Sequence, residues 1–352
     1  MSKNKISCLF LSQEDLISAG CFDLKAAMAC ARQALMDYQN GKILFPEKIV
    51  QIFNEETQER INCLPATLLE EKVCGVKWVS VFPLNPVKYG KQNLSALILL
   101  SEIETGFPVA VMEGTLCSNI RVAAMGGIAA DFLARKNSET IGFIGAGEQA
   151  KMHLLAMKSV RPSLKICKVA SKYAEEEDKF ISDMQAVLPD IKFISCRTIL
   201  KDAITGSDII VTATSAQAPL LKAEWIKEGA FYSHIGGWED EFAVAKKASK
   251  IVCDDWDTVK HRTQTLSRMF KCGELTDNDI YANLHEIVMG KKAPRETEDE
   301  FIYFNAVGLS YVDVSIAYNM FKTCRNAGIG THLRLQDSMI FDKANLIEKI
   351  II

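Results

Sequence analysis

Apolar and polar positions alternate over short runs in the first third of the chain. A helix-like stretch extends from Leu24 to Tyr38 and is ended by Asn40 and Gly41. The runs that follow are bounded by turn residues and have the length of strands. Strands that succeed one another without helices between them favour an antiparallel or mixed sheet. These runs are residues 48–53, 60–64, 73–82, 96–101 and 108–113.

The pattern changes in the middle of the chain. An alanine-rich run over residues 119–135 predicts a long helix, in which Gly126 and Gly127 indicate close packing. Apolar segments then alternate with spacers of helix length, as in a parallel sheet whose two faces are buried. A last helix is expected after Asp313, ending at Gly328. The strand-like segments are 139–144, 164–169, 191–195, 208–212, 230–235 and 250–253.

Composition narrows the class of partner. The chain has 352 residues, a formal charge of −3, and interspersed charges that form no basic face for nucleic acid or an anionic membrane. No apolar run reaches roughly 18 residues, and the first ten residues lack the apolar stretch of a signal peptide. The eleven scattered cysteines lack CxxC spacing, and the five histidines lack HxxxH spacing. We therefore expect a cytoplasmic protein with free thiols, no metal site, and a small molecule as its partner.

A glycine-rich turn gives the strongest chemical signal. In ETIGFIGAGEQAKMHLLAM, Gly145 permits a tight turn, Gly147 lets the backbone approach a pyrophosphate, and Ala150 lets helix and sheet close up. The N–H groups at the start of the helix then face the phosphates. Strand, glycines, helix and second strand in this order predict a dinucleotide site. Its expected contacts are Gly145, Ala146, Gly147, Glu148 and Gln149.

The end of the second strand bears on the choice of cofactor. An NAD enzyme usually has Asp or Glu there for the ribose hydroxyls, but this chain has Ser171 and Lys172. A hydroxyl and a cation suit a 2′-phosphate, which favours NADP over NAD. The alternative is a solvated lysine at a strand end, so both cofactors stay open.

Several segments resemble the ornithine cyclodeaminase/mu-crystallin family, and together they span nearly the whole chain. The resemblance implies an α/β protein in which a Rossmann NAD(P)-binding domain, expected over residues 121–309, is inserted in an α+β domain. That second domain, expected over residues 1–120 and 310–352, would bind the substrate and form a homodimer. The segments are GVKWVS, GFPVAVMEGTLCSNIRVAA, IGFIGAGEQA, DIIVTATS, KEGAFYSHIGG and FNAVGLSYVDVSIAY.

The resemblance also implies cations that bind the substrate. Lys77 and Arg121 match the family's substrate-site cations, and Lys48 stands where an arginine often binds the substrate carboxylate. Burying Lys77 in VCGVKWVSV is costly, and a carboxylate ligand would offset that cost, unless Lys77 faces outward from an edge strand. Arg121 is expected to open a helix, where an anionic ligand would offset the unfavourable dipole. Lys77 is also the candidate for taking the amine proton.

One position departs from the cyclodeaminase pattern. Cyclodeaminases of the family carry a catalytic Asp directly after a glycine pair, whereas this chain has Trp238, which cannot transfer protons. Trp238 is instead expected to shape the substrate pocket. Glu239 and Asp240 either reach the site from the same loop or are solvated acids. The departure favours the dehydrogenase branches, and CDDWD and NAGIGTHLRL resemble the branch that oxidises N-(2-amino-2-carboxyethyl)-L-glutamate to 2,3-diaminopropionate and 2-oxoglutarate.

Other polar and aromatic residues near these motifs have simpler interpretations. Thr212 and Thr214 contact the nicotinamide half of the cofactor or are ordinary threonines at a strand end. His234 is expected to be a core histidine with its hydrogen bonds satisfied, and Trp78 and Trp256 are expected to be core residues.

The function implied is hydride transfer between NAD(P) and the α-carbon of an amino-acid-like secondary amine or imine. Two alternatives stay open. One is an ornithine cyclodeaminase, which forms proline and ammonia without net reduction of the cofactor. The other is a non-enzymatic, NADPH-dependent small-molecule binder of the mu-crystallin kind.

Overall fold

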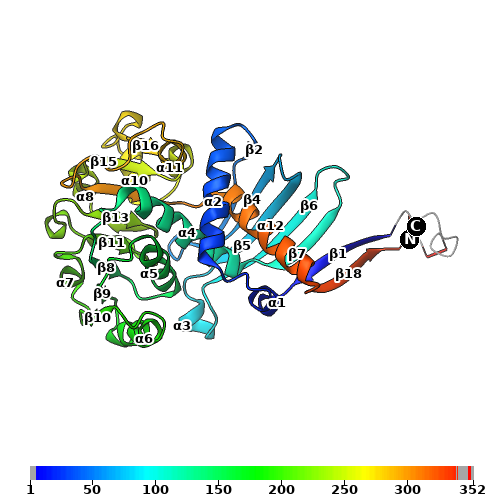
Figure 1. Ribbon diagram of the computed structural model, residues 1–352, viewed down its shortest axis with the longest axis horizontal. Helices are drawn as coiled ribbons and strands as arrows, with labels where there is room; N and C mark the ends of the chain where they lie inside the picture. The colour runs from blue at the N-terminus through cyan, green and yellow to red at the C-terminus, as the bar shows by residue number, and fades with distance from the viewer. Residues whose placement is uncertain (1–4, 338, 340–347, 350–352) are drawn as a thin grey trace. The chain divides into compact units, whose positions relative to one another are not determined.

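The computed structural model describes residues 5–337, 339 and 348–349. Two compact units make up the chain (Figure 1). Unit 1 comprises Met1–Asp23, Gly41–Ser118 and Asp313–Ile352, and unit 2 comprises Leu24–Asn40 and Asn119–Val312.

One helix departs from the expected division into domains. Helix α2 (Leu24–Gln39) groups with unit 2, whereas the expected first domain included all of residues 1–120. An ion pair within unit 2 helps to account for this, because Arg32 Nη2 lies 2.9 Å from Asp131 Oδ2. The sequence between α2 and the first predicted strand gave no sign that the helix would pack with a later part of the chain.

Unit 1 is built on a mixed eight-stranded sheet. Its strand order is β18-β1-β7-β6-β5-β4-β2, with β3 paired to β4. The four strands β4 to β7 are antiparallel neighbours in chain order, as the succession of short strands predicted. The strands are β1 (Ile6–Leu11), β2 (Ile43–Leu44), β3 (Ile49–Asn54), β4 (Glu59–Leu68), β5 (Val73–Val81), β6 (Leu94–Glu102), β7 (Pro108–Glu113) and β18 (Thr331–Gln336).

The two faces of this sheet differ. Helix α12 (Ser310–Ala327) runs across one face (Figure 1), so closely that a Cβ on Gly75 would lie 2.9 Å from side-chain atoms of Leu100 and Val314. The other face carries apolar side chains in register across the strands, with Trp78 paired to Leu97. Trp78 is 46% exposed and Leu97 50% exposed, so the expectation that Trp78 is a core residue is wrong.

Unit 2 contains a second eight-stranded sheet, in which every neighbouring pair of strands is parallel. Its order is β10-β9-β8-β11-β13-β17-β15-β16, so the chain moves outward in one direction from β8 and then in the other from β11. Ligands of such sheets bind at this switch point, beside the carboxyl ends of the strands. The strands are β8 (Thr140–Ile144), β9 (Ile166–Ala170), β10 (Lys192–Ser195), β11 (Ile209–Thr212), β13 (Phe231–His234), β15 (Lys250–Cys253), β16 (Ala282–Asn283) and β17 (Ile302–Asn305); β12 (Gln217–Leu221) pairs separately with β14 (Trp238–Asp240).

Helices cover both faces of the parallel sheet, as its apolar strands require. On one face, α7, α8 and α10 join a single core with the strands, through residues such as Ala203, Val244 and Leu266. On the other, Phe180 of α6 packs against Phe143 of β8 with ring centroids 5.7 Å apart. The remaining helices are α1 (Gln13–Ser18), α3 (Asn85–Tyr89), α4 (Thr115–Leu133), α5 (Glu148–Val160), α6 (Ala174–Gln185), α7 (Leu200–Ile204), α8 (Phe242–Lys247), α9 (Trp256–Val259), α10 (Thr265–Lys271) and α11 (Leu284–Val288), with 3₁₀ turns at Ala223–Trp225 and Asp277–Asp279.

Helix α4 is long and apolar enough to cross a membrane by those two criteria alone. However, 72% of its apolar window is buried inside the protein. A core helix that is surrounded by other elements is apolar on all sides for that reason.

Candidate functional site

The turn between β8 and α5 has the shape that its glycines predicted. Gly145 has a φ of +104°, and a Cβ there would lie 2.5 Å from the carbonyl oxygen of Ala213. The Gly145 N–H donates to the carbonyl of Ala170 over 2.8 Å. Both the backbone conformation and the neighbouring strand end therefore require glycine at this position.

Gly147 is needed for a different reason. It is the N-cap of α5, it has an ordinary φ of −79°, and no heavy atom lies within 4 Å of the Cβ that it lacks. No side chain caps the first N–H groups of α5. An open space thus faces a helix N-terminus at the switch point, which is the arrangement that binds a pyrophosphate. The residues present fit a dinucleotide at this turn, and the predicted contacts from Gly145 to Gln149 all lie on it.

The end of β9 offers both a cation and a carboxylate. Lys172 is exposed, with Nζ 5.2 Å from the centre of the Tyr173 ring. Ser171 is buried and its hydroxyl donates to a carboxylate oxygen of Glu176. The sequence had suggested that no acid stands at this strand end, but Glu176 reaches it from the first turn of α6. The arrangement suits ribose hydroxyls as well as a 2′-phosphate.

A buried carboxylate joins two loops at the carboxyl edge of the sheet. Glu239 is fully buried, and its oxygens accept from the Thr212 hydroxyl at 2.8 Å, the Thr214 N–H at 2.6 Å and the Gly236 N–H at 2.8 Å. Thr212 and Thr214 are therefore more than threonines at a strand end, because both hydroxyls bond Glu239. The alternative of a solvated Glu239 is wrong.

His234 and Asp240 lie in the same buried network. The His234 ring nitrogens contact Asn305 Oδ1 and the Gly237 carbonyl, each at 2.9 Å, which confirms a satisfied core histidine. Asp240 is fully buried and accepts from the Thr265 hydroxyl at 2.5 Å. Burial raises the pKa of Asp240 to about 6, against the opposing effect of His234. Asp240 is therefore not a solvated acid either.

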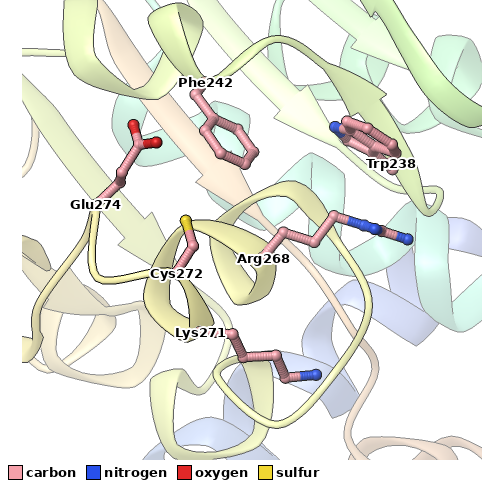
Figure 2. Close-up of a pocket in the computed structure, with 6 residues that line it drawn as sticks. All are labelled: Trp238, Phe242, Arg268, Lys271, Cys272 and Glu274. Atoms are coloured by element: carbon pink, nitrogen blue, oxygen red, sulfur yellow. The ribbon is translucent and has the colours of Figure 1, made fainter.

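Trp238 begins β14 directly after the glycine pair and is half-buried. The guanidinium carbon of Arg268 lies 4.5 Å from the centre of its ring. Both side chains line a depression of about 480 Å³ within unit 2 (Figure 2). Its other lining residues are Phe242, Lys271, Cys272 and Glu274.

Lys77 is held inside unit 1. It is 1% exposed on β5, a strand with neighbours on both sides, so the alternative of an outward-facing edge lysine is wrong. Its Nζ lies 2.6 Å from Asp313 Oδ1. Sequence reasoning assigned the partner carboxylate to a substrate and missed Asp313. The signal was Asp313 itself, which stands between two valines at the start of α12. Lys48 is half-buried just before β3.

Arg121 lies farther into α4 than expected. The helix begins at Thr115, so Arg121 is its seventh residue and the expected interaction with the helix N-terminus does not apply. Its guanidinium instead packs against the loop after β17, where a Cβ on Gly308 would lie 2.3 Å from Nη1. Gly308 also has a φ of +90°, so both its backbone conformation and its contact with Arg121 require glycine.

Thiol groups are numerous among the described residues. All eleven cysteines lie within them, and none of the eleven is in a disulfide. Among these residues, no group of three or more His, Cys, Asp or Glu side chains is arranged to hold a metal ion.

Comparisons with known proteins agree with this fold. The model of the ornithine cyclodeaminase/mu-crystallin family matches residues 10–327. The N-((2S)-2-amino-2-carboxyethyl)-L-glutamate dehydrogenase of Staphylococcus aureus is 29% identical over 93% of this chain and 98% of its own length.

Two solved structures are similar over almost their full lengths. The Δ1-pyrroline-2-carboxylate reductase of Thermococcus litoralis, in complex with NADH and L-proline, is 32% identical with a TM-score of 0.86, covering 92% of this chain and 99% of that one. An archaeal alanine dehydrogenase dimer with bound NAD is also 32% identical with a TM-score of 0.86, covering 94% and 100%.

Proposed function

Because this chain belongs to the ornithine cyclodeaminase/mu-crystallin family, we propose that it is an NAD(P)-dependent dehydrogenase or reductase acting at the α-carbon of an amino-acid-like amine or imine. The observation that carries the proposal is the open space at Gly147, which faces the uncapped start of α5 at the switch point of the parallel sheet. Three similar enzymes act on alanine, on Δ1-pyrroline-2-carboxylate and on an N-substituted glutamate, so an amino-acid-like substrate is common to them.

In this proposal the chain orients the substrate against the cofactor and encloses both, while a bound nicotinamide would supply the hydride donor or acceptor. The Gly145–Gly147 turn and the first N–H groups of α5 hold the pyrophosphate. Glu239 fixes the loops after β11 and β13, beside which the nicotinamide lies in folds of this type. Trp238 places an aromatic wall on that loop and limits access of water.

The same loop supports a dehydrogenase over a cyclodeaminase. The residue after the glycine pair is Trp238, and the two acids that follow it are fully buried and hydrogen-bonded within unit 2. Glu239 is occupied by backbone and threonine donors, so it is not available to position water or ammonia at a reacting carbon. Asp240 is buried, and its Oδ1 accepts from Thr265 and Tyr303. A non-enzymatic binder would differ from a dehydrogenase in that it converts no substrate.

The finer proposal concerns the substrate. We infer that it is N-(2-amino-2-carboxyethyl)-L-glutamate or a close analogue, oxidised at the glutamyl α-carbon. The support is the similarity to the Staphylococcus aureus enzyme over nearly the whole of both chains. The roles of Lys48, Lys77 and Arg121 as substrate-binding cations remain predictions.

We also propose a homodimer formed through the open face of the unit 1 sheet. Two rows of side chains cross this face in register, Ile49–Cys63–Trp78–Leu97 and Pro65–Val76–Leu99–Val111. Exposed apolar rows on a flat sheet are typical of a surface that another molecule covers. The archaeal alanine dehydrogenase is a dimer, which supports a second copy as the occupant. Eleven cysteines without a disulfide support a cytoplasmic location.

The nucleotide site is tested by filling the space at Gly147. Gly147→Val keeps an allowed backbone conformation but places a branched side chain where the pyrophosphate must approach. We expect a loss of affinity for NAD and NADP of about 100-fold or more by calorimetry, with an unchanged melting temperature of the nucleotide-free protein. Gly147→Ala, the graded control, should lose less. Unchanged affinity in Gly147→Val would refute this site.

A further inference from the structure

The depression beside Trp238 has a chemistry that the proposed reaction does not use. Two of its walls are aromatic, from Trp238 and Phe242, and two of its lining side chains are cations, from Arg268 and Lys271 (Figure 2). Its one carboxylate, Glu274, is paired with Lys246 at 2.7 Å. Local charge is therefore positive, and the depression suits an anionic group attached to an apolar stem.

The Arg268 side chain is held beside Trp238 by contacts within unit 2. Its Nε donates to the carbonyl of Thr263 over 2.9 Å, which fixes the base of the guanidinium. Its guanidinium carbon stands 4.5 Å from the centre of the Trp238 ring. An arginine fork beside an aromatic ring can bind a carboxylate through two parallel hydrogen bonds from its terminal nitrogens.

The helix that carries Arg268 is tied to the loop that carries Trp238. Gln264, the N-cap of α10, donates to the carbonyl of Gly236 over 2.7 Å. The next residue, Thr265, donates to Asp240 two residues beyond Trp238. Arginine and tryptophan are thus positioned by one buried network before any ligand arrives, which reduces the entropy lost on binding.

The position of this depression identifies the part of the ligand that it faces. Trp238 follows the carboxyl end of β13, on the nicotinamide side of the switch point. The 2′ end of the cofactor belongs at β9, two strands beyond β11 in the other direction, where Ser171 and Lys172 lie. An anion beside Arg268 is therefore a group of the substrate and not a phosphate of the nucleotide.

We propose that Arg268 and Trp238 form a binding site for a second carboxylate, which the substrate carries on a short aliphatic stem beyond its reacting α-carbon. The methylene groups of the stem pack on Trp238 and Phe242, and the carboxylate binds the Arg268 fork. This assignment rests on the proposed function and makes it narrower. It selects amino and oxo acids with a distal acid group over alanine or proline.

The test uses two oxo acids with the same five-carbon skeleton, 2-oxoglutarate and 2-oxopentanoate, which differ only in a distal carboxylate or methyl group. Their affinities are measured by calorimetry with saturating oxidised cofactor. The full chain should bind 2-oxoglutarate at least about ten-fold more tightly, because hydrogen bonds to charged groups are worth that much. Arg268→Gln should abolish this preference and change 2-oxopentanoate binding less than about two-fold, while Arg268→Lys should restore part of it.

Lys222→Gln is the matched control, because Lys222 also stands over a tryptophan ring of unit 2, 5.8 Å from the centre of Trp225. It should keep the full preference. Thermal melting first shows that wild type and Arg268→Gln are both folded. An equal preference for 2-oxoglutarate in the two proteins would then overturn the proposed site, and so would the absence of any preference in wild type.

Formation of reduced cofactor is measured separately, which keeps the two proposals distinguishable. Equal oxidation of alanine or proline by wild type and Arg268→Gln, without a preference for 2-oxoglutarate, would overturn the carboxylate site and leave the dehydrogenase standing. An Arg268-dependent preference in a protein that reduces no cofactor would support the site and contradict the dehydrogenase.

Discussion

The buried side chain of His153 makes the free energy of unfolding depend on pH. The imidazole is fully buried on α5, its Nδ1 lies 2.8 Å from the carbonyl oxygen of Gln149, and burial lowers its pKa to about 4. The folded chain therefore keeps His153 neutral at a pH where the unfolded chain protonates it. Its contribution to stability is complete above pH 6.5 and is lost as pH falls toward 4.

The corresponding prediction concerns His153→Gln, whose amide can still donate to the Gln149 carbonyl but cannot titrate. Between pH 7.5 and 4.5 the wild type should lose about 2–3 kcal/mol more free energy of unfolding than the variant. Urea denaturation at several pH values measures the difference. Asp240 and Asp254, whose pKa values are raised to about 6 by burial, act in the opposite direction but equally in both proteins. Parallel pH profiles would show that His153 does not titrate in this way.

Single residues were predictable where the local backbone alone demands them. Gly145 and Gly147 follow from the chemistry of one tight turn, and the structure has that turn. Asp313 was missed because it meets Lys77 through packing of a segment 236 residues away. Glu176 stands only five residues after Ser171, so the acidic start of the following helix was a local signal that it could reach the strand end. A buried cation in an apolar strand predicts that some carboxylate is near, but not which one.

At the scale of elements, the predicted helices and strands were mostly correct to within a few residues. The long helix predicted over residues 119–135 is α4, which begins four residues earlier, and that shift alone changed the physical interpretation of Arg121. Strands β1 and β18 were not predicted, because they form one antiparallel edge from the two ends of the chain. No local pattern reports a pairing between segments so distant in sequence.

The loop of Trp238 illustrates the same limit within unit 2. The sequence established that an aromatic residue replaces the family's Asp, since that is a matter of one position. It could not establish that Glu239 would hold the loops after β11 and β13 together, because that requires four donors from two loops to converge on one carboxylate. The carboxyl edge of the unit 2 sheet is therefore fixed by a buried carboxylate.

At the scale of the whole molecule, the open face of the unit 1 sheet predicts self-association. Trp78→Glu places a charge in the centre of the apolar row between Cys63 and Leu97. We expect the wild type to be a dimer and this variant a monomer at micromolar concentration, measured by light scattering after size exclusion. Val87→Glu is the control, because Val87 is 88% exposed on α3 outside both rows and should leave the dimer intact. A wild-type monomer, or a dimeric Trp78→Glu, would refute this interface.

We expect the chain to transfer hydride with net reduction or oxidation of its cofactor. The most direct measurement is the absorbance of reduced cofactor when the purified protein is mixed with NAD or NADP and either N-(2-amino-2-carboxyethyl)-L-glutamate, L-alanine, L-proline or L-ornithine. We predict steady formation of reduced cofactor, equal in amount to the oxo acid or imine released, with N-(2-amino-2-carboxyethyl)-L-glutamate as the preferred substrate. Conversion of L-ornithine to proline and ammonia without accumulation of reduced cofactor would contradict net hydride transfer.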